Sequence, residues 1–144
     1  MRVLGVDVGA RRLGLALSDS TASLARPWQT IPAGETPRKS AEAIAALVIG
    51  ARSQDDESGD IGEIVVGLPR KLNGEDTEQT ASARGIAAAL GEATGLVVHL
   101  QDERLSSREA ESRLALREKD WRKRKMKLDA AAAAVILQDY LDRD

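Results

Sequence analysis

The sequence predicts a single α/β domain, residues 1–144, with a mixed β-sheet and helices on both faces. Residues 2–8 and 13–18 each alternate between apolar side chains and others, which is typical of two antiparallel strands in a hairpin. The continuous apolar run at 64–68 is typical of a strand buried on both faces. Segments with helical periodicity separate the later strands, so crossover connections should add those strands in parallel.

The antiparallel part should contain three strands. In the first, Leu4, Val6 and Val8 share one face, and Gly5 and Asp7 share the other. The intervening GARR can form the hairpin turn because Gly9 tolerates a positive φ. A third strand is expected at 24–31.

Four helices and one more strand follow from local signals in the rest of the chain. Thr36 should cap the first helix, which begins at Pro37 and ends near Gly50. Its buried stripe should contain Ile44, Leu47 and Val48, and that of the second helix Ala83, Ile86, Ala87 and Leu90. Residues 96–101 should form the next strand. Ser106 and Glu109 make a capping box for a third helix, and a fourth should run from about 128 to 141.

Composition excludes several classes of site and places the chain in the cytoplasm by default. There is no cysteine and only one histidine, which excludes disulfides, thiolate metal sites and multi-histidine zinc sites. No apolar run is long enough to span a bilayer, and the N-terminus has no signal-peptide pattern. Any bound metal should therefore use oxygen or imidazole ligands.

Charge is unevenly distributed. The net charge is −2, but residues 104–127 hold ten Lys and Arg against four Asp and Glu. A basic segment on an acidic body is what phosphate binding requires, although a solvated helix face with a basic loop would show the same pattern. The densest basic run is Arg122, Lys123, Arg124, Lys125 and Lys127, expected in a loop that contacts the nucleic-acid backbone.

Three carboxylates stand at the ends of core elements. Asp7 lies near the end of an apolar strand, where it needs a metal or a hydrogen-bonding partner, or else caps the following turn. Glu103 follows the strand at 96–101 and should share a face with Gln101, whereas Asp102 should point the other way. Both acids could instead be solvated, or paired with Arg104 or Arg108.

The third carboxylate is that of Asp129, which opens the run AAAAAVIL and lies on its core-facing side, unless it is the helix N-cap. Asp7, Glu103 and Asp129 together could hold Mg²⁺ or Mn²⁺. Such ions can activate water and stabilise the leaving oxygen of a phosphodiester, so a metal-dependent nuclease is the favoured interpretation. Arg11 and Arg12 follow Gly9, and an arginine there could hold a phosphate beside the metal.

Four blocks spanning the chain resemble the YqgF family, which is related to RuvC-type Holliday junction resolvases: LGVDVGARRLGLALSD (4–19), VVGLPRKLNGED (65–76), DERLSSREAE (102–111) and KMKLDAAAAAVILQDYL (125–141). The resemblance implies a ribonuclease-H-like fold and a nuclease that matures the 5′ end of pre-16S rRNA. It implies that Asp7, Glu103 and Asp129 are the catalytic acids, and it implies roles for Arg12 and for the basic segment.

Three alternatives remain open. A junction resolvase acting on branched DNA would need a dimer with two sites, and the sequence does not decide between monomer and homodimer. An actin-like sugar kinase or ATPase shares the core and begins with a similar hairpin, but it needs two such domains. A ribosome-assembly factor that only binds RNA would use the basic face, yet it would gain nothing from an acid trio beside phosphate. The expected partner in the leading interpretation is RNA or single-stranded or branched DNA, with no membrane.

Overall fold

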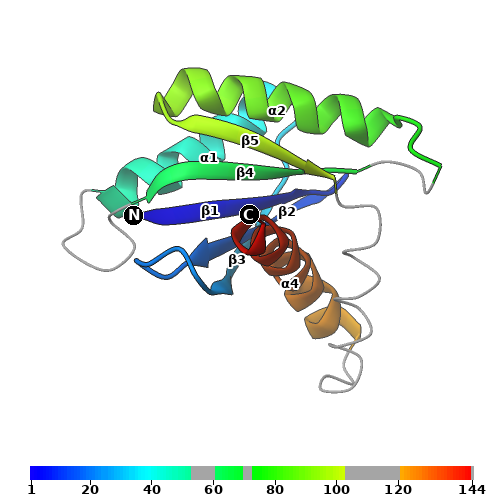
Figure 1. The fold of residues 1–144 in the computed structure, drawn as a ribbon. Helices are drawn as coiled ribbons and strands as arrows, with labels where there is room; N and C mark the ends of the chain where they lie inside the picture. The colour runs from blue at the N-terminus through cyan, green and yellow to red at the C-terminus, as the bar shows by residue number, and fades with distance from the viewer. Residues whose placement is uncertain (53–60, 70–72, 103–120, 144) are drawn as a thin grey trace.

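The computed structural model describes residues 1–52, 61–69, 73–102 and 121–143. Within these residues the chain forms one five-stranded sheet in the order β3-β2-β1-β4-β5, with helices on both faces (Figure 1). The strands are β1 (Arg2–Val8), β2 (Arg12–Ser18), β3 (Ala25–Pro32), β4 (Ile61–Leu68) and β5 (Val97–Asp102). The helices are α1 (Pro37–Arg52), α2 (Glu78–Thr94) and α4 (Trp121–Asp142). The capping box at Ser106 and Glu109 lies outside the described residues.

The sheet is mixed in the way the sequence predicts. Strand β2 pairs antiparallel with both β1 and β3, and β4 pairs in parallel with both β1 and β5. The first three strands therefore form an antiparallel meander, to which the two crossover strands are added at one edge.

The hairpin between β1 and β2 forms for a different reason from the expected one. Gly9 does not have a positive φ; among the described glycines only Gly74 and Gly95 do. Instead, its amide donates to the carbonyl of Arg12 at 3.0 Å, and a Cβ on Gly9 would lie 2.7 Å from that same oxygen. Glycine is required here because the two strands approach closely, rather than because the backbone is left-handed.

Helices α1 and α2 cover one face of the sheet (Figure 1). Their predicted stripes are confirmed, with Ile44, Val48, Ala83, Ile86, Ala87 and Leu90 buried and Leu47 partly buried. Thr36 caps α1, since its hydroxyl accepts from the amide of Lys39 at 3.1 Å. The helix continues two residues past Gly50, to Arg52. Gly95 ends α2 in the left-handed conformation, with φ of 72°.

Helix α4 covers the opposite face (Figure 1). The buried side chains of the helix pack on the face of the sheet that carries Val3, Ala16 and Val65. These helical side chains are Ala133, Ile136, Leu137 and Tyr140. The helix approaches the sheet closely because Gly5 lacks a side chain: a Cβ there would lie 2.8 Å from Cβ of Leu137. The two faces of the sheet thus carry two separate cores, one under each helical layer.

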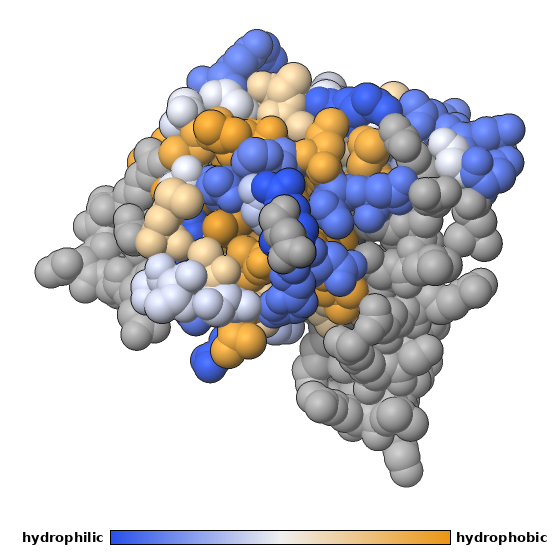
Figure 2. Space-filling view, viewed as in Figure 1, coloured by the Kyte–Doolittle hydropathy of each residue, from blue (hydrophilic) through white to orange (hydrophobic). Residues whose placement is uncertain are grey.

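Strand β5 forms one edge of the described sheet, and it exposes apolar surface. Val97 is 61% exposed and Leu100 is 44% exposed. Apolar atoms accordingly reach the surface near this strand in Figure 2. None of the helices that the structure describes is long and apolar enough to cross a membrane.

Candidate active site

Asp7 lies on the face of the sheet that α4 covers. Leu4, Val6 and Val8 pack under α1 and α2, so the alternate residues of β1 face α4, Asp7 among them. Asp7 is partly buried and stands one residue before the end of the strand. This is the face that the alternation in the sequence predicts.

A glycine brings Asp7 and Asp129 together. Gly14 on β2 is the cross-strand partner of Asp7. The backbone of α4 passes so close above Gly14 that a Cβ there would collide with the carbonyl group of Asp129. Gly14 therefore lies between the strand that carries one acid and the helix that carries the other, and any larger residue would push them apart.

Asp129 lies inside α4 rather than at its N-cap. The helix begins at Trp121, so the expected start near 128 was wrong, and capping does not explain the aspartate. The predicted core-facing stripe is confirmed, because Ala132, Ala133, Ile136 and Tyr140 are buried. The side chain of Asp129 is 24% exposed, which places a carboxylate at the edge of the core.

Arg12 binds Asp129 directly. Its Nε donates to Oδ2 of Asp129 at 2.7 Å, and the arginine side chain is 31% exposed. The sequence predicts that Arg12 is near the acids but not that it contacts one of them, because the two residues lie 117 positions apart. The neighbouring Arg11 is exposed. Of the two arginines, Arg12 is therefore the one placed at the acids.

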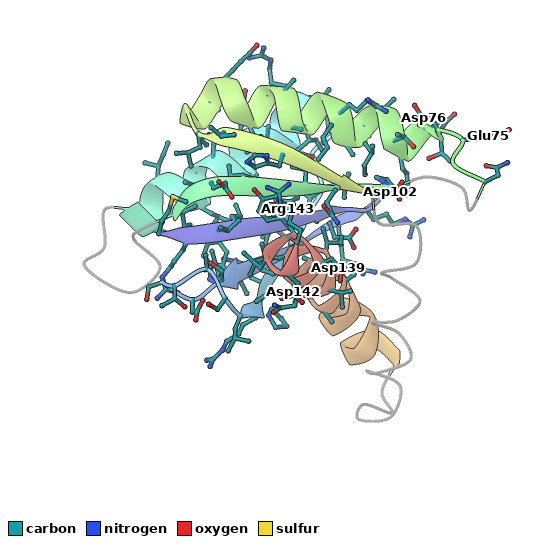
Figure 3. The ribbon with its side chains drawn as sticks, viewed as in Figure 1. Glu75, Asp76, Asp102, Asp139, Asp142 and Arg143 are labelled. Atoms are coloured by element: carbon teal, nitrogen blue, oxygen red, sulfur yellow. The ribbon has the colours of Figure 1, made fainter. Side chains whose placement is uncertain are left out.

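The third predicted acid, Glu103, lies outside the described residues. The strand before it is described: Gln101 pairs with Gly67, and Asp102 pairs with Leu68. Leu68 packs in the core under α1 and α2, so Asp102 occupies a register position on that side of the sheet, and Gln101 one on the α4 side. Asp102 is exposed at the end of β5 (Figure 3).

Two of the three predicted metal ligands are therefore described, on the same face of the sheet. The described residues contain no group of three or more acidic, histidine or cysteine side chains that could hold a metal ion. The donors present, two carboxylates, are the type that Mg²⁺ and Mn²⁺ prefer. The guanidinium on Asp129 also demonstrates that this carboxylate accepts a cationic partner.

The basic run is helical rather than a loop. Residues 121–128 belong to the first turns of α4, although their side chains lie outside what the structure describes. Arg122, Lys123, Arg124, Lys125 and Lys127 thus precede Asp129 on a continuous helix, which corrects the expected basic loop. Lysine and arginine are good helix formers, so nothing in this run stops the helix from starting early.

A second polar cluster lies on the α4 face, and sequence reasoning missed it. The hydroxyl of Tyr140 donates to Oε1 of Glu63 at 2.8 Å, and His99 Nε2 lies 3.6 Å from Oε2 of the same residue. The guanidinium of Arg143 stacks over the Tyr140 ring, 3.9 Å from the ring centroid. Burial, and then the bond to Glu63, raise the pKa of Tyr140. The cluster joins the end of α4 to β4 and β5.

The chain is similar to known proteins over almost its whole length. The family model described as "RuvX: Holliday junction resolvase" matches residues 1–143. A protein of Anaeromyxobacter dehalogenans named "Putative pre-16S rRNA nuclease" is 44% identical over 99% of this chain and 98% of its own. A protein of the same name from Maridesulfovibrio salexigens is 38% identical over 99% of both chains.

A solved structure shares the fold. RuvC from Thermus thermophilus, in complex with a Holliday junction substrate, superposes with a TM-score of 0.53 at 17% identity, over 98% of this chain and 93% of that one. This likeness confirms the ribonuclease-H-like architecture that the order of elements and the four sequence blocks predict.

Proposed function

Because the chain belongs to the RuvX family, we propose that it is a divalent-metal-dependent nuclease that hydrolyses phosphodiester bonds at the 5′ end of pre-16S rRNA. The names of the relatives that match over the full length support this RNA as the substrate. Acting there would make it a ribosome-biogenesis enzyme of the cytoplasm. The full-length family match favours the nuclease over the sugar-kinase alternative, which would require two such domains.

The observation that carries the proposal is the juxtaposition of Asp7 and Asp129 across Gly14. The two acids come from the first strand and the last helix, yet the backbones of both lie beside Gly14. Asp7 is the cross-strand partner of Gly14, and the backbone of Asp129 passes over Gly14 where a Cβ would otherwise be. Two partly buried carboxylates on one face repel each other, and Arg12 beside Asp129 offsets part of that repulsion. A binding protein for RNA would gain nothing from such negative charge beside phosphates, and an enzyme that holds metal would.

In this proposal Asp7, Asp129 and Glu103 hold Mg²⁺ or Mn²⁺. The bound ion would supply an activated water and would stabilise the oxygen that leaves the phosphodiester. The protein's own contribution is placement: β1 and α4 fix two of the acids, and their partial burial strengthens their interaction with any cation. Arg11, Arg12 and the basic residues at the start of α4 would hold the RNA backbone near these acids.

A Holliday junction resolvase is the second candidate, since the family description names that activity and RuvC shares the fold. It would cut paired strands of a four-way DNA junction, and it would need two copies of the site in a dimer. The two functions therefore differ in substrate and in oligomeric state, while they use the same acids.

A cleavage assay with three substrates tests the proposal: a pre-16S 5′ leader RNA, single-stranded DNA and a four-way junction. The metal-free protein should be inactive in EDTA and should cut the leader after addition of Mn²⁺. Asp7→Asn should abolish cleavage and retain the fold, with thermal stability that holds or rises in the absence of metal. Glu42→Gln, an exposed acid on α1, is the matched control and should cut normally. Cutting in EDTA would refute metal dependence, and cutting of the junction alone would favour the resolvase.

A further inference from the structure

Arg12 binds the carboxylate of Asp129, which is also one of the proposed metal ligands. Its Nε lies 2.7 Å from Oδ2 of Asp129, the distance of a strong charge-assisted hydrogen bond. Both side chains are partly buried, at 31% and 24% exposure, so water screens the pair only in part. The acid that the proposed function assigns to metal thus already has a cationic partner.

The backbones at both ends of this ion pair are fixed. Arg12 is the first residue of β2: its carbonyl accepts from Gly9, and its Cα pairs with Pro32 on β3. Asp129 is held against Gly14 by the close approach of α4. Any change in this contact must therefore occur in the side chains. The long arginine side chain can turn away without a backbone movement, whereas the short aspartate has little freedom.

We propose that Arg12 is an exchangeable counter-ion: it neutralises Asp129 in the metal-free enzyme and is displaced onto the RNA phosphate when the metal binds. This inference rests on the proposed function. It follows from charge, because a divalent ion at Asp129 repels the guanidinium and satisfies the carboxylate at the same time. The freed guanidinium remains tethered beside the acids, where a phosphate held for cleavage needs a planar, bidentate donor. Metal binding and RNA binding are therefore coupled through one residue.

Metal affinity without RNA is the first test, measured by calorimetry or by the EPR signal of free Mn²⁺. Arg12→Gln removes the competitor, so its affinity for Mn²⁺ should exceed that of the wild type by roughly three- to tenfold. Arg12→Lys keeps the positive charge and should stay closer to the wild type. Arg38→Gln, which removes an exposed charge on α1, is the matched control and should bind Mn²⁺ as the wild type does.

RNA affinity is the second test, measured by rapid mixing before cleavage occurs, so that every proposed metal ligand stays in place. Arg12→Gln should weaken binding of the leader RNA when Mn²⁺ is present and should change it much less in EDTA. If Arg12→Gln lowers Mn²⁺ affinity or leaves it unchanged, Arg12 is not a displaced counter-ion. Equal loss of RNA affinity with and without metal would also overturn the exchange. If the wild type binds no Mn²⁺ at all, the proposed function itself fails.

Thermal unfolding keeps the test decisive if Arg12→Gln is unstable. The variant leaves Asp129 without its counter-charge, so in EDTA its melting temperature should fall below that of the wild type. Mn²⁺ should then raise the melting temperature of the variant more than that of the wild type, because tighter binding to the folded state stabilises it further. An equal rise in both proteins would contradict the exchange.

Discussion

Gly14 lies directly beneath the backbone of Asp129, and no side chain would fit between them. The same glycine is the cross-strand partner of Asp7. The distance between the first strand and the last helix is thus set by a missing Cβ, and the placement of both acids depends on it.

Gly14→Ala should therefore destabilise the protein and shift α4 away from the sheet. Overpacking against rigid backbone typically costs about 1–3 kcal/mol, and cleavage should fall further than stability because Asp129 moves. Chemical denaturation and a single-turnover assay measure the two effects. Gly50→Ala is the control: a Cβ on Gly50 meets nothing within 4 Å, and alanine should stabilise α1 by roughly 0.5–1 kcal/mol. Wild-type stability and activity in Gly14→Ala would show that α4 is not fixed at this point.

The strand register places Asp102 on the side of the sheet away from Asp7. Asp102 pairs with Leu68, which packs on the side of α1 and α2, away from Asp7. Glu103→Gln should therefore reduce the single-turnover rate at saturating Mn²⁺ by orders of magnitude. Asp102→Asn should change the rate little and stability by about 1 kcal/mol or less, as for an exposed charge. The reverse result would mean that the wrong acid of this pair has been assigned to the metal.

The basic residues at the start of α4 should not contribute equally. Arg122 and Lys125 precede Asp129 by seven and four residues, the spacing of one helical face, whereas Lys123 and Lys127 do not have that spacing. Replacing Arg122 and Lys125 by Gln should weaken RNA binding and reduce the slope of log affinity against log salt by roughly 0.7–1 per lost phosphate contact. The Lys123 and Lys127 double variant is the matched control for net charge. Equal effects of the two pairs would indicate a diffuse electrostatic contribution.

Tyr140 should make stability depend on alkaline pH. Burial and the bond to Glu63 raise its pKa, so the folded state favours the neutral phenol. That stabilisation is present below the unfolded pKa of about 10 and is lost as pH rises through the higher folded value. Tyr140→Phe should lack this alkaline component and lose about 1 kcal/mol at neutral pH with the hydrogen bond to Glu63.

The single tyrosine of the chain makes this measurement direct. Tyrosinate absorbance should report a higher pKa in the folded protein than in urea-unfolded protein. Identical titration curves in the two states would show that the contact with Glu63 does not form in solution.

Much of the fold could be predicted because periodicity reflects burial. The predicted apolar stripes around Ile44 and Ile86 are buried against the sheet. The alternation around Val6 correctly places Asp7 on the face of the sheet opposite to Val6. The start of α4 was missed because a cluster of like charges was interpreted as a loop, although lysine and arginine favour helices. The role of Gly9 was misjudged because a glycine signals either a left-handed residue or a close approach, and sequence alone does not separate the two.

The site was less predictable than the fold. The side of the sheet on which Asp7 and Asp129 lie could be predicted, but their contacts join distant parts of the chain. Nothing local to Arg12 indicates that its partner is Asp129, and nothing local to Gly14 indicates that a helix passes over it. The same holds for Glu63, whose partners Tyr140 and His99 come from two other elements.

The close contact between Gly14 and α4 also determines when Asp7 and Asp129 can first come together during synthesis. During synthesis the N-terminal hairpin leaves the ribosome early, but it has no helix above it until residues near Asp129 have emerged. A nascent or prematurely terminated chain therefore holds one acid of the pair and lacks the other. The two carboxylates can therefore be brought together only after α4 has been synthesised and has packed on the sheet.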